Sequence, residues 1–174
     1  LVDDKDIIRD YIQDCVNSVG NDALAIVGLQ GGYLITKNYI EKDKIKITYG
    51  YYGGKNILIK NKDIENEINK YYSYFLPMCV NELKGYNIKV QNASAKTSIL
   101  NNSVKVNIKY PVELLKGDTK IVIDENYKKE YKAKLGSMRD IADNIIKKTM
   151  KNESFIDIGY LLDIGDEFYV RIVP

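Results

Sequence analysis

Residues 3–19, DDKDIIRDYIQDCVNSV, decide the fold, because they combine a helix start with a long apolar stripe. The carboxylates of Asp3 and Asp4 are typical of a first helical turn, where unpaired backbone N–H groups favour acceptors and negative charge. Apolar side chains then recur at the spacing of one helix face: Ile7, Ile8, Tyr11, Ile12, Cys15, Val16 and Val19. We therefore expect an amphipathic helix that begins near Asp3 and covers the core with this face.

The segment after this helix is expected to be irregular. Residues 20–22, Gly-Asn-Asp, are poor helix formers and are expected to interrupt the helix. Residues 23–29 are apolar on all sides, which predicts one or two buried helical turns that end at Gly31 and Gly32. Residues 33–35 are then expected to form a strand.

Two further helices follow from the same apolar spacing. The second is predicted from Asp63 to about Leu83, and Pro77 is expected to kink or end it. The third is predicted after Ser137, whose hydroxyl is a typical N-cap.

Most of the remaining chain has the period of two that indicates strands. A hairpin is predicted over residues 39–52, and a meander of short strands over residues 86–135, with turns at 101–102 and 117–118 and a separate strand at 111–115. The sequence thus predicts a single α+β domain over residues 1–174. Its antiparallel sheet, built of hairpins, is expected to pack against the N-terminal helix and two further helices.

Composition and charge exclude several classes of protein. Hydrophobic residues make up 45% of the chain and charged residues 29%, which fits neither a disordered nor a membrane-spanning chain. Lys and Arg number 26 against 24 Asp and Glu, so the net charge is +2, and the lysines are scattered among acids. Because nucleic-acid-binding proteins gather their basic residues, no nucleic-acid partner is expected.

The chain contains no histidine, which excludes Ser-His and Cys-His catalytic pairs and His-ligated metal sites. Carboxylate chemistry is left, yet Asp and Glu occur singly among lysines, as on a solvated surface. We therefore expect no catalytic residue, no cofactor and no metal. The alternative is a carboxylate-based hydrolase or a small-ligand-binding domain whose site is assembled from distant segments.

The chain has 15 tyrosines, and two short stretches are especially rich in them. An exposed group of tyrosines can bind a protein, a glycan or a second subunit, because each ring is apolar and each hydroxyl is polar. Tyrosine is also a common half-buried strand residue, so the same positions can belong to the core. The candidate binding patch comprises Tyr49, Tyr51, Tyr52, Tyr71, Tyr72 and Tyr74.

The two cysteines lie on the apolar faces of the two strongest predicted helices. Cys15 and Cys79 should therefore both point inward, and they could meet where those helices pack. A disulfide between them would close a loop of about 64 residues and stabilise the fold by roughly 4 kcal/mol. Two buried free thiols fit the same pattern equally well.

Asn92, Asn101 and Asn152 each begin an Asn-X-Ser triplet, the acceptor pattern for N-glycosylation. All three lie in predicted turns or at the ends of predicted elements. About one such triplet is expected by chance in a chain so rich in Asn. The additional triplets favour an exported protein.

Four segments together resemble a known family: DYIQDCVNSVGNDALAIVGLQGGYL, DIENEINKYYSYFLPMC, VKVNIKYPVEL and KLGSMRDIADNIIKK. In this order they are similar to uncharacterised envelope proteins of small, host-dependent archaea, over most of residues 8–148. In that family a pilin-like hydrophobic leader precedes the soluble domain, and one cysteine lies in the first helix and another after the helix ending in LPxC. Cys15 and Cys79 match these positions, so the resemblance implies that they form a disulfide outside the cytosol.

The resemblance also sets the expected function. It implies a non-enzymatic extracellular or cell-envelope module that acts in attachment, filament assembly or envelope structure. The expected partner is a protein or glycan at the cell surface, or a second copy of the chain. Residues 1–174 contain no hydrophobic leader, so membrane association is expected only through an anchor that precedes Leu1.

Overall fold

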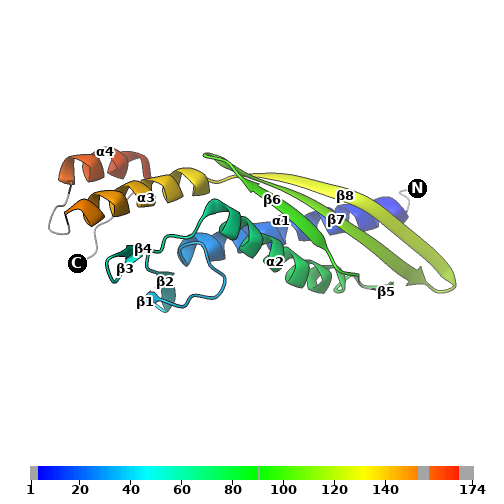
Figure 1. Cartoon of the computed structure of the whole chain (residues 1–174). Helices are drawn as coiled ribbons and strands as arrows, with labels where there is room; N and C mark the ends of the chain where they lie inside the picture. The colour runs from blue at the N-terminus through cyan, green and yellow to red at the C-terminus, as the bar shows by residue number, and fades with distance from the viewer. Residues whose placement is uncertain (1–3, 90, 153–156, 169–174) are drawn as a thin grey trace.

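The computed structural model describes residues 4–89, 91–152 and 157–168, which form an α+β fold (Figure 1). The helices are α1 (Asp4–Leu29), α2 (Asn61–Val80), α3 (Leu135–Lys151) and α4 (Ile158–Phe168). The strands are β1 (Tyr39–Lys42), β2 (Ile45–Thr48), β3 (Tyr51–Tyr52), β4 (Lys55–Asn56), β5 (Asn87–Lys89), β6 (Ser94–Ile99), β7 (Ser103–Lys116) and β8 (Thr119–Lys132). The predicted class, an antiparallel sheet packed against an N-terminal helix and further helices, is confirmed.

The elements form an elongated molecule with two layers (Figure 1). α1 and α2 pack side by side against one face of the sheet formed by β5–β8, and α1 runs along most of its length. The small hairpins β1–β2 and β3–β4 lie near the carboxyl end of α1, where the Thr48 N–H donates to the Gln30 carbonyl. α3 and α4 lie beyond the end of the sheet that is opposite the N-terminus.

The sheet is built around β7. β8 pairs with β7 along all 14 residues, and on the other side β6 pairs with residues 104–109 and β5 with residues 113–115. All of these pairings are antiparallel. The predicted turns at 101–102 and 117–118 are confirmed, but the strands between them are longer than predicted.

The separate strand predicted at residues 111–115 is wrong, because β7 continues through Pro111. The Leu100 N–H donates to the Ser103 carbonyl, so the odd-numbered residues of β7 direct their backbone groups towards β5 and β6. Pairing with β6 ends at Lys109 and pairing with β5 begins at Glu113. Pro111 therefore lies in the gap between these two strands, where no partner requires the N–H that proline lacks.

Burial alternates along β7 and β8, as expected for a sheet covered on one face. The inner face contributes Val104, Val106, Ile108, Tyr110, Val112 and Leu114 of β7 and Ile121, Ile123, Tyr127 and Tyr131 of β8 to the core. The residues between them are mostly polar and exposed, and no described element covers them. The core therefore lies between this inner face and the buried stripes of α1 and α2.

The interruption predicted at residues 20–22 is also wrong, because α1 is one continuous helix. Gly20 is buried beneath the hydroxyls of Tyr72 and Tyr131, and a Cβ at this position would overlap both oxygens. These hydroxyls lie 3.1 and 2.9 Å from the Val16 carbonyl oxygen and 2.8 Å from each other. The glycine is therefore required by packing and does not mark a break.

Cys15 and Cys79 form a disulfide that joins α1 to α2, with 5.8 Å between their Cα atoms. The described cysteines are therefore bonded, as the resemblance implied, and are not two free thiols. The Tyr11 hydroxyl donates to the Cys79 carbonyl over 3.1 Å, a second link at the same place.

Three local predictions need correction. Residues 33–35 form a loop and not a strand. Pro77 does not end α2, which continues to Val80. Lys134 is the N-cap of α3, and the Ser137 hydroxyl instead donates to the Asn101 carbonyl over 2.9 Å, which attaches α3 to the turn between β6 and β7.

Candidate functional site

The structure divides the six candidate tyrosines between two places and the core. Tyr72 is fully buried, so its assignment to a surface patch is wrong. Tyr71 and Tyr74 lie on α2 and border a groove, whereas Tyr49, Tyr51 and Tyr52 lie on or beside the small hairpins. Adjacent residues of a helix point in directions about 100° apart, so Tyr71 and Tyr72 face different surroundings although they are neighbours in the sequence.

The groove has a volume of about 840 Å³ and lies between α1, the loop after it and α2. We call it the aromatic groove. Its apolar walls are Ile26, Tyr33, Leu34, Ile35, Tyr71, Tyr74 and Phe75, and Lys37, Glu67 and Lys70 lie at its rim. Ile35 is 81% exposed and Tyr74 is 66% exposed, so the walls are open to solvent.

The second half of α2 carries two apolar stripes. The inner stripe contains Tyr72 and Leu76 and belongs to the core. The outer stripe comprises Tyr71, Tyr74, Phe75 and Met78, at the i, i+3, i+4, i+7 spacing of one helix face. The rings of Tyr71 and Phe75 lie 4.2 Å apart and those of Tyr74 and Phe75 4.9 Å apart, so the three rings of the outer stripe form a continuous aromatic surface.

The loop that forms the opposite wall is held by two side chains. The Gln30 amide donates to the carbonyls of Tyr33 and Leu34, at 3.1 Å each. The Leu34 N–H donates to Glu67 Oε2 over 3.1 Å, which ties the loop to α2. Ile35 is therefore presented to solvent by a fixed backbone.

The rim of the groove has one paired and one unpaired lysine. Lys70 Nζ lies 2.6 Å from Glu67 Oε1, so Glu67 serves both the loop and an ion pair. Lys37 is exposed and has no ion pair among the residues that the structure describes.

The hydroxyls of Tyr33 and Tyr71 in the groove remain protonated near neutral pH. Burial raises the pKa of Tyr33, and the carboxylates of Asp63 and Glu67 raise it further. Burial also raises the pKa of Tyr71, with a smaller contribution from Asp22. Both side chains can therefore exchange hydrogen bonds with a bound molecule but cannot act as bases at this pH.

The hairpins carry a second, smaller aromatic cluster. The rings of Tyr49 and Tyr52 stack at 5.7 Å, and Lys46 Nζ lies 4.9 Å from the centre of the Tyr39 ring. Tyr52 is 58% exposed, whereas Tyr51 is half-buried.

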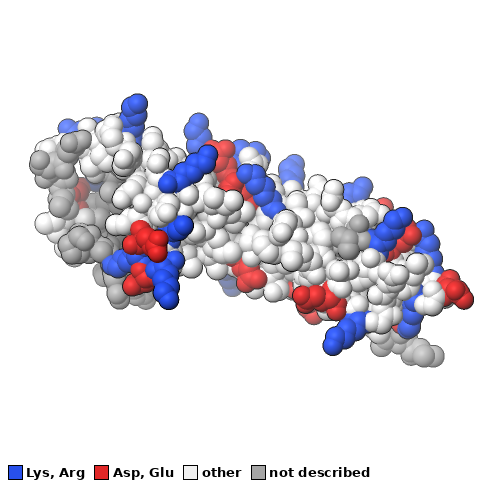
Figure 2. All heavy atoms as spheres, turned by 90° about the horizontal axis from the view of Figure 1, so that it is seen from below, with Lys and Arg blue, Asp and Glu red and all other residues white. Residues whose placement is uncertain are grey.

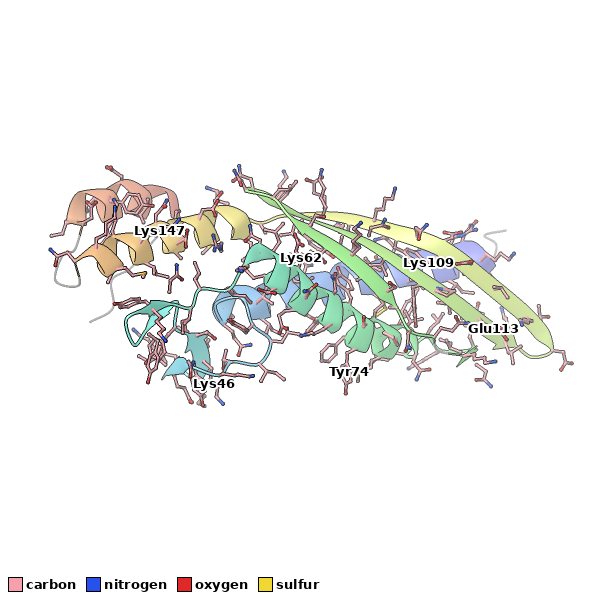
Figure 3. The ribbon with its side chains drawn as sticks, viewed as in Figure 1. Lys46, Lys62, Tyr74, Lys109, Glu113 and Lys147 are labelled. Carbon is pink, nitrogen blue, oxygen red and sulfur yellow. A yellow bond between two sulfur atoms is a disulfide. The ribbon has the colours of Figure 1, made fainter. Side chains whose placement is uncertain are left out.

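Both aromatic regions lie on the side of the molecule that carries α2 and the hairpins. In Figure 3, Tyr74 and Lys46 lie below α2 and the hairpins, away from the sheet that carries Lys109. Figure 2 looks onto this lower side, where uncharged side chains cover most of the middle and the charged groups lie towards the margins.

The carboxylates of the described residues are dispersed, and no group of three His, Cys, Asp or Glu could hold a metal ion there. The aromatic groove and three other hollows lined by described residues each contain at most one carboxylate. Hydrogen bonds from Lys116 and Lys147 lower the pKa of Asp4 and Asp143, respectively. Such lowered values are typical of surface ion pairs, whereas a general acid needs a raised pKa.

The asparagines of all three predicted glycosylation sites are exposed. Asn92 is exposed before β6, and Asn101 is exposed in the turn that receives α3. Asn152 is exposed at the carboxyl end of α3, but the rest of its triplet lies outside the described residues.

Comparison with known proteins gives no relative for this fold or site. No family model matches the chain, and no curated protein and no solved structure matches it. Over the described residues, no helix combines the length and the apolarity needed to cross a lipid bilayer.

Proposed function

We propose that this protein is a non-enzymatic binding module of the cell envelope that binds an apolar segment of a partner protein in the aromatic groove. The observation that carries the proposal is that the groove is both exposed and held in place. Gln30 donates hydrogen bonds to the loop and Glu67 accepts one from it, yet Ile35 and Tyr74 face solvent. A contiguous exposed apolar surface of this kind is typical of an interaction site.

The polar groups of the groove favour a protein segment over a glycan. A sugar must exchange its hydroxyl–water hydrogen bonds for hydrogen bonds to the protein. Gln30 and Glu67 already hold the loop, so the tyrosine hydroxyls are the main polar groups left within otherwise apolar walls. A peptide with apolar side chains gains about 25 cal/mol for each Å² of apolar surface that it buries there.

The charge at the rim indicates what lies beside those apolar side chains. Lys37 has no ion pair among the described residues, and the Glu67 charge is offset by Lys70. The rim is therefore positive, and an Asp or Glu of the partner would complement it. The proposed partner segment combines apolar side chains with a neighbouring acid.

The disulfide supports a location outside the cytosol. Bonds such as Cys15–Cys79 persist in oxidising compartments and are rare in the cytosol. Attachment, filament assembly or envelope structure would each use a rigid, exposed binding surface, with any membrane anchor supplied by a segment outside residues 1–174.

A display library of random 12-residue peptides tests this function. Peptides selected by the intact protein are expected to contain apolar pairs next to Asp or Glu. Tyr74→Ser combined with Ile35→Ser should weaken their binding more than tenfold, as expected for the loss of a central aromatic contact. The matched control is Tyr52→Ser, which removes a similarly exposed tyrosine outside the groove and should change binding less than twofold.

Three results would contradict the proposal. The selected peptides could bind the groove variant as well as the intact protein, they could lack both apolar and acidic residues, or a glycan array could show saccharides that lose binding with Tyr74→Ser. Circular dichroism of each variant confirms that the comparison is made between folded proteins.

A further inference from the structure

We propose that the outer face of the sheet binds an acidic polysaccharide through five lysines: Lys96, Lys105, Lys109, Lys128 and Lys132. We call this surface the lysine face. It lies on the side of the sheet that α1 and α2 do not cover, and all five side chains are exposed. It is separate from the aromatic groove, so the two proposals stand independently.

Strand register gathers these lysines from three segments. Lys96 of β6 lies opposite Asn107 of β7, and Asn107 lies opposite Lys128 of β8. Lys105 and Lys109 are the same-face neighbours of Asn107 along β7. The strand spacing of about 5 Å and the two-residue repeat of about 7 Å therefore place four lysines around one asparagine.

The charge of the lysine face is largely unbalanced. Lys105 lies 3.9 Å from Glu130, and the other four lysines have no ion pair among the residues that the structure describes. With Glu130 included the face carries a net charge of +4, whereas the whole chain carries +2. Positive charge is therefore concentrated here, although lysines and acids alternate along the sequence.

An ordinary solvated sheet face would place opposite charges across from each other, because such pairs stabilise a sheet and like charges do not. Here only Lys105 lies opposite an acid, Glu130. The other four lysines lie opposite neutral residues, as Lys109 does between Ser94 and Asn126. Four of the five lysines thus lack a cross-strand partner that would neutralise them, and a bound polyanion would supply such partners.

The surface is also hollowed between the lysines. A shallow hollow of about 470 Å³ is lined by Lys96, Ser98, Lys105, Asn107 and Lys128. The serine and the asparagine can exchange hydrogen bonds with sugar hydroxyls, while the ammonium groups pair with carboxylates. This combination fits a chain of acidic sugars.

Other polyanions fit less well. A bilayer surface would favour exposed apolar side chains among the lysines. The residues that line the hollow are Lys, Ser, Asn and Glu, apart from Val106, whose side chain is buried. Single-stranded nucleic acid favours exposed aromatic rings for stacking, but Tyr110, Tyr127 and Tyr131 of these strands all point into the core.

Binding to polygalacturonate, a carboxylated polysaccharide, tests the proposal over a series of NaCl concentrations. The intact protein should bind with an affinity that falls as salt rises, because bound counterions are released. Lys96→Glu, Lys109→Glu and Lys128→Glu together should weaken binding more than tenfold at 50 mM NaCl. The corresponding glutamine triple variant should have a log–log salt slope smaller by about two to three.

The matched control changes the net charge equally at exposed lysines elsewhere: Lys42→Glu, Lys55→Glu and Lys84→Glu. It should retain binding within threefold. The proposal is overturned if this control loses binding as the first triple variant does, if the intact protein does not bind polygalacturonate, or if it binds phosphatidylglycerol vesicles or oligodeoxythymidine more tightly at the same salt concentration.

Discussion

Gly20 is the residue at which α1, α2 and the sheet meet. Without a side chain there, the hydroxyls of Tyr72 and Tyr131 both reach the Val16 carbonyl. Burial, followed by the hydrogen bond with Tyr131, raises the pKa of Tyr72, so its hydroxyl stays protonated and available as a donor. One absent methyl group thus allows a polar contact between three elements inside the core.

Gly20→Ala should destabilise the protein by roughly 1–3 kcal/mol, because the added Cβ would push both tyrosines out of place. Gly28→Ala is the matched control in the same helix. A Cβ at Gly28 meets no atom within 4 Å, so the variant should gain up to about 1 kcal/mol from helix propensity alone. Urea unfolding measures both changes, and equal effects of the two substitutions would contradict the packing role of Gly20.

Two buried tyrosines should make the stability fall at alkaline pH. Burial raises the pKa of Tyr110 to about 12 and that of Tyr127 to about 12, and Glu125 contributes to the second shift. The unfolded chain releases these protons near pH 10, so the stabilisation is complete below pH 10 and is lost as the pH rises to 12. The loss should reach about 2–3 kcal/mol for each tyrosine.

Urea unfolding between pH 8 and 11.5 measures this dependence. Tyr110→Phe combined with Tyr127→Phe removes both groups and should flatten the curve in part, while Tyr74→Phe, at an exposed position, should leave it unchanged. A double variant with the same alkaline loss as the parent would refute the assignment to these two residues.

At the scale of elements, β7 tolerates a proline only at the gap between its two partner strands. Pro111→Val should therefore change the free energy of unfolding by less than about 1 kcal/mol. Lys109→Pro moves the proline by two residues to a position that pairs with Ser94, and should cost at least about 1–3 kcal/mol through a lost ladder hydrogen bond. Thermal unfolding compares the two variants, and equal losses would show that the gap does not matter.

The disulfide is the covalent link between α1 and α2. Reduction should lower the free energy of unfolding by up to about 4 kcal/mol, since the bond closes a loop with a sequence separation of 64. Urea unfolding with and without dithiothreitol measures this difference. The control is Cys15→Ala with Cys79→Ala, which should not respond to the reductant. Labelling of two thiols in unfolded, unreduced protein would disprove the bond.

The sequence predicted those elements whose signal is local. Apolar spacing predicted α1 and α2, and alternation with Asn101-Asn102 and Gly117-Asp118 predicted the sheet and its turns. Gly20 and Pro111 misled the prediction, because each usually breaks an element. Gly20 is required by the packing of two tyrosines distant in sequence, and Pro111 lies where neither β5 nor β6 pairs with β7. At such positions tertiary contacts outweigh the intrinsic helix or strand propensity of the residue.

At the scale of the whole molecule, the two proposed surfaces lie on opposite sides of the core: the aromatic groove beside α2 and the lysine face on the outer side of the sheet. Neither is visible in the sequence alone. The groove depends on Gln30 and Glu67 folding the loop onto α2, and the lysine face depends on strand register. Together they would allow one domain to link a protein to a polysaccharide.

The carboxyl-terminal helices should open before the rest of the molecule. Of its described residues, α3 buries only Gly136 and Ile146, and residues 158–165 of α4 contain no fully buried side chain. Hydrogen exchange measured by mass spectrometry should therefore show protection at least tenfold lower in α3 than in β7, which buries six apolar side chains. Equal protection in the two elements would mean that they unfold as one unit.

The disulfide also has a mechanical consequence for the proposed link between a protein and a polysaccharide. The chain between Cys15 and Cys79, a separation of 64 residues, would otherwise extend by roughly 220 Å when pulled straight. With the bond intact, tension applied to the ends of the chain passes from one sulfur to the other. The small hairpins and the part of α2 before Cys79 then bear no tension. The residues that line the aromatic groove all lie between the two cysteines, so pulling on the chain ends does not stretch the groove.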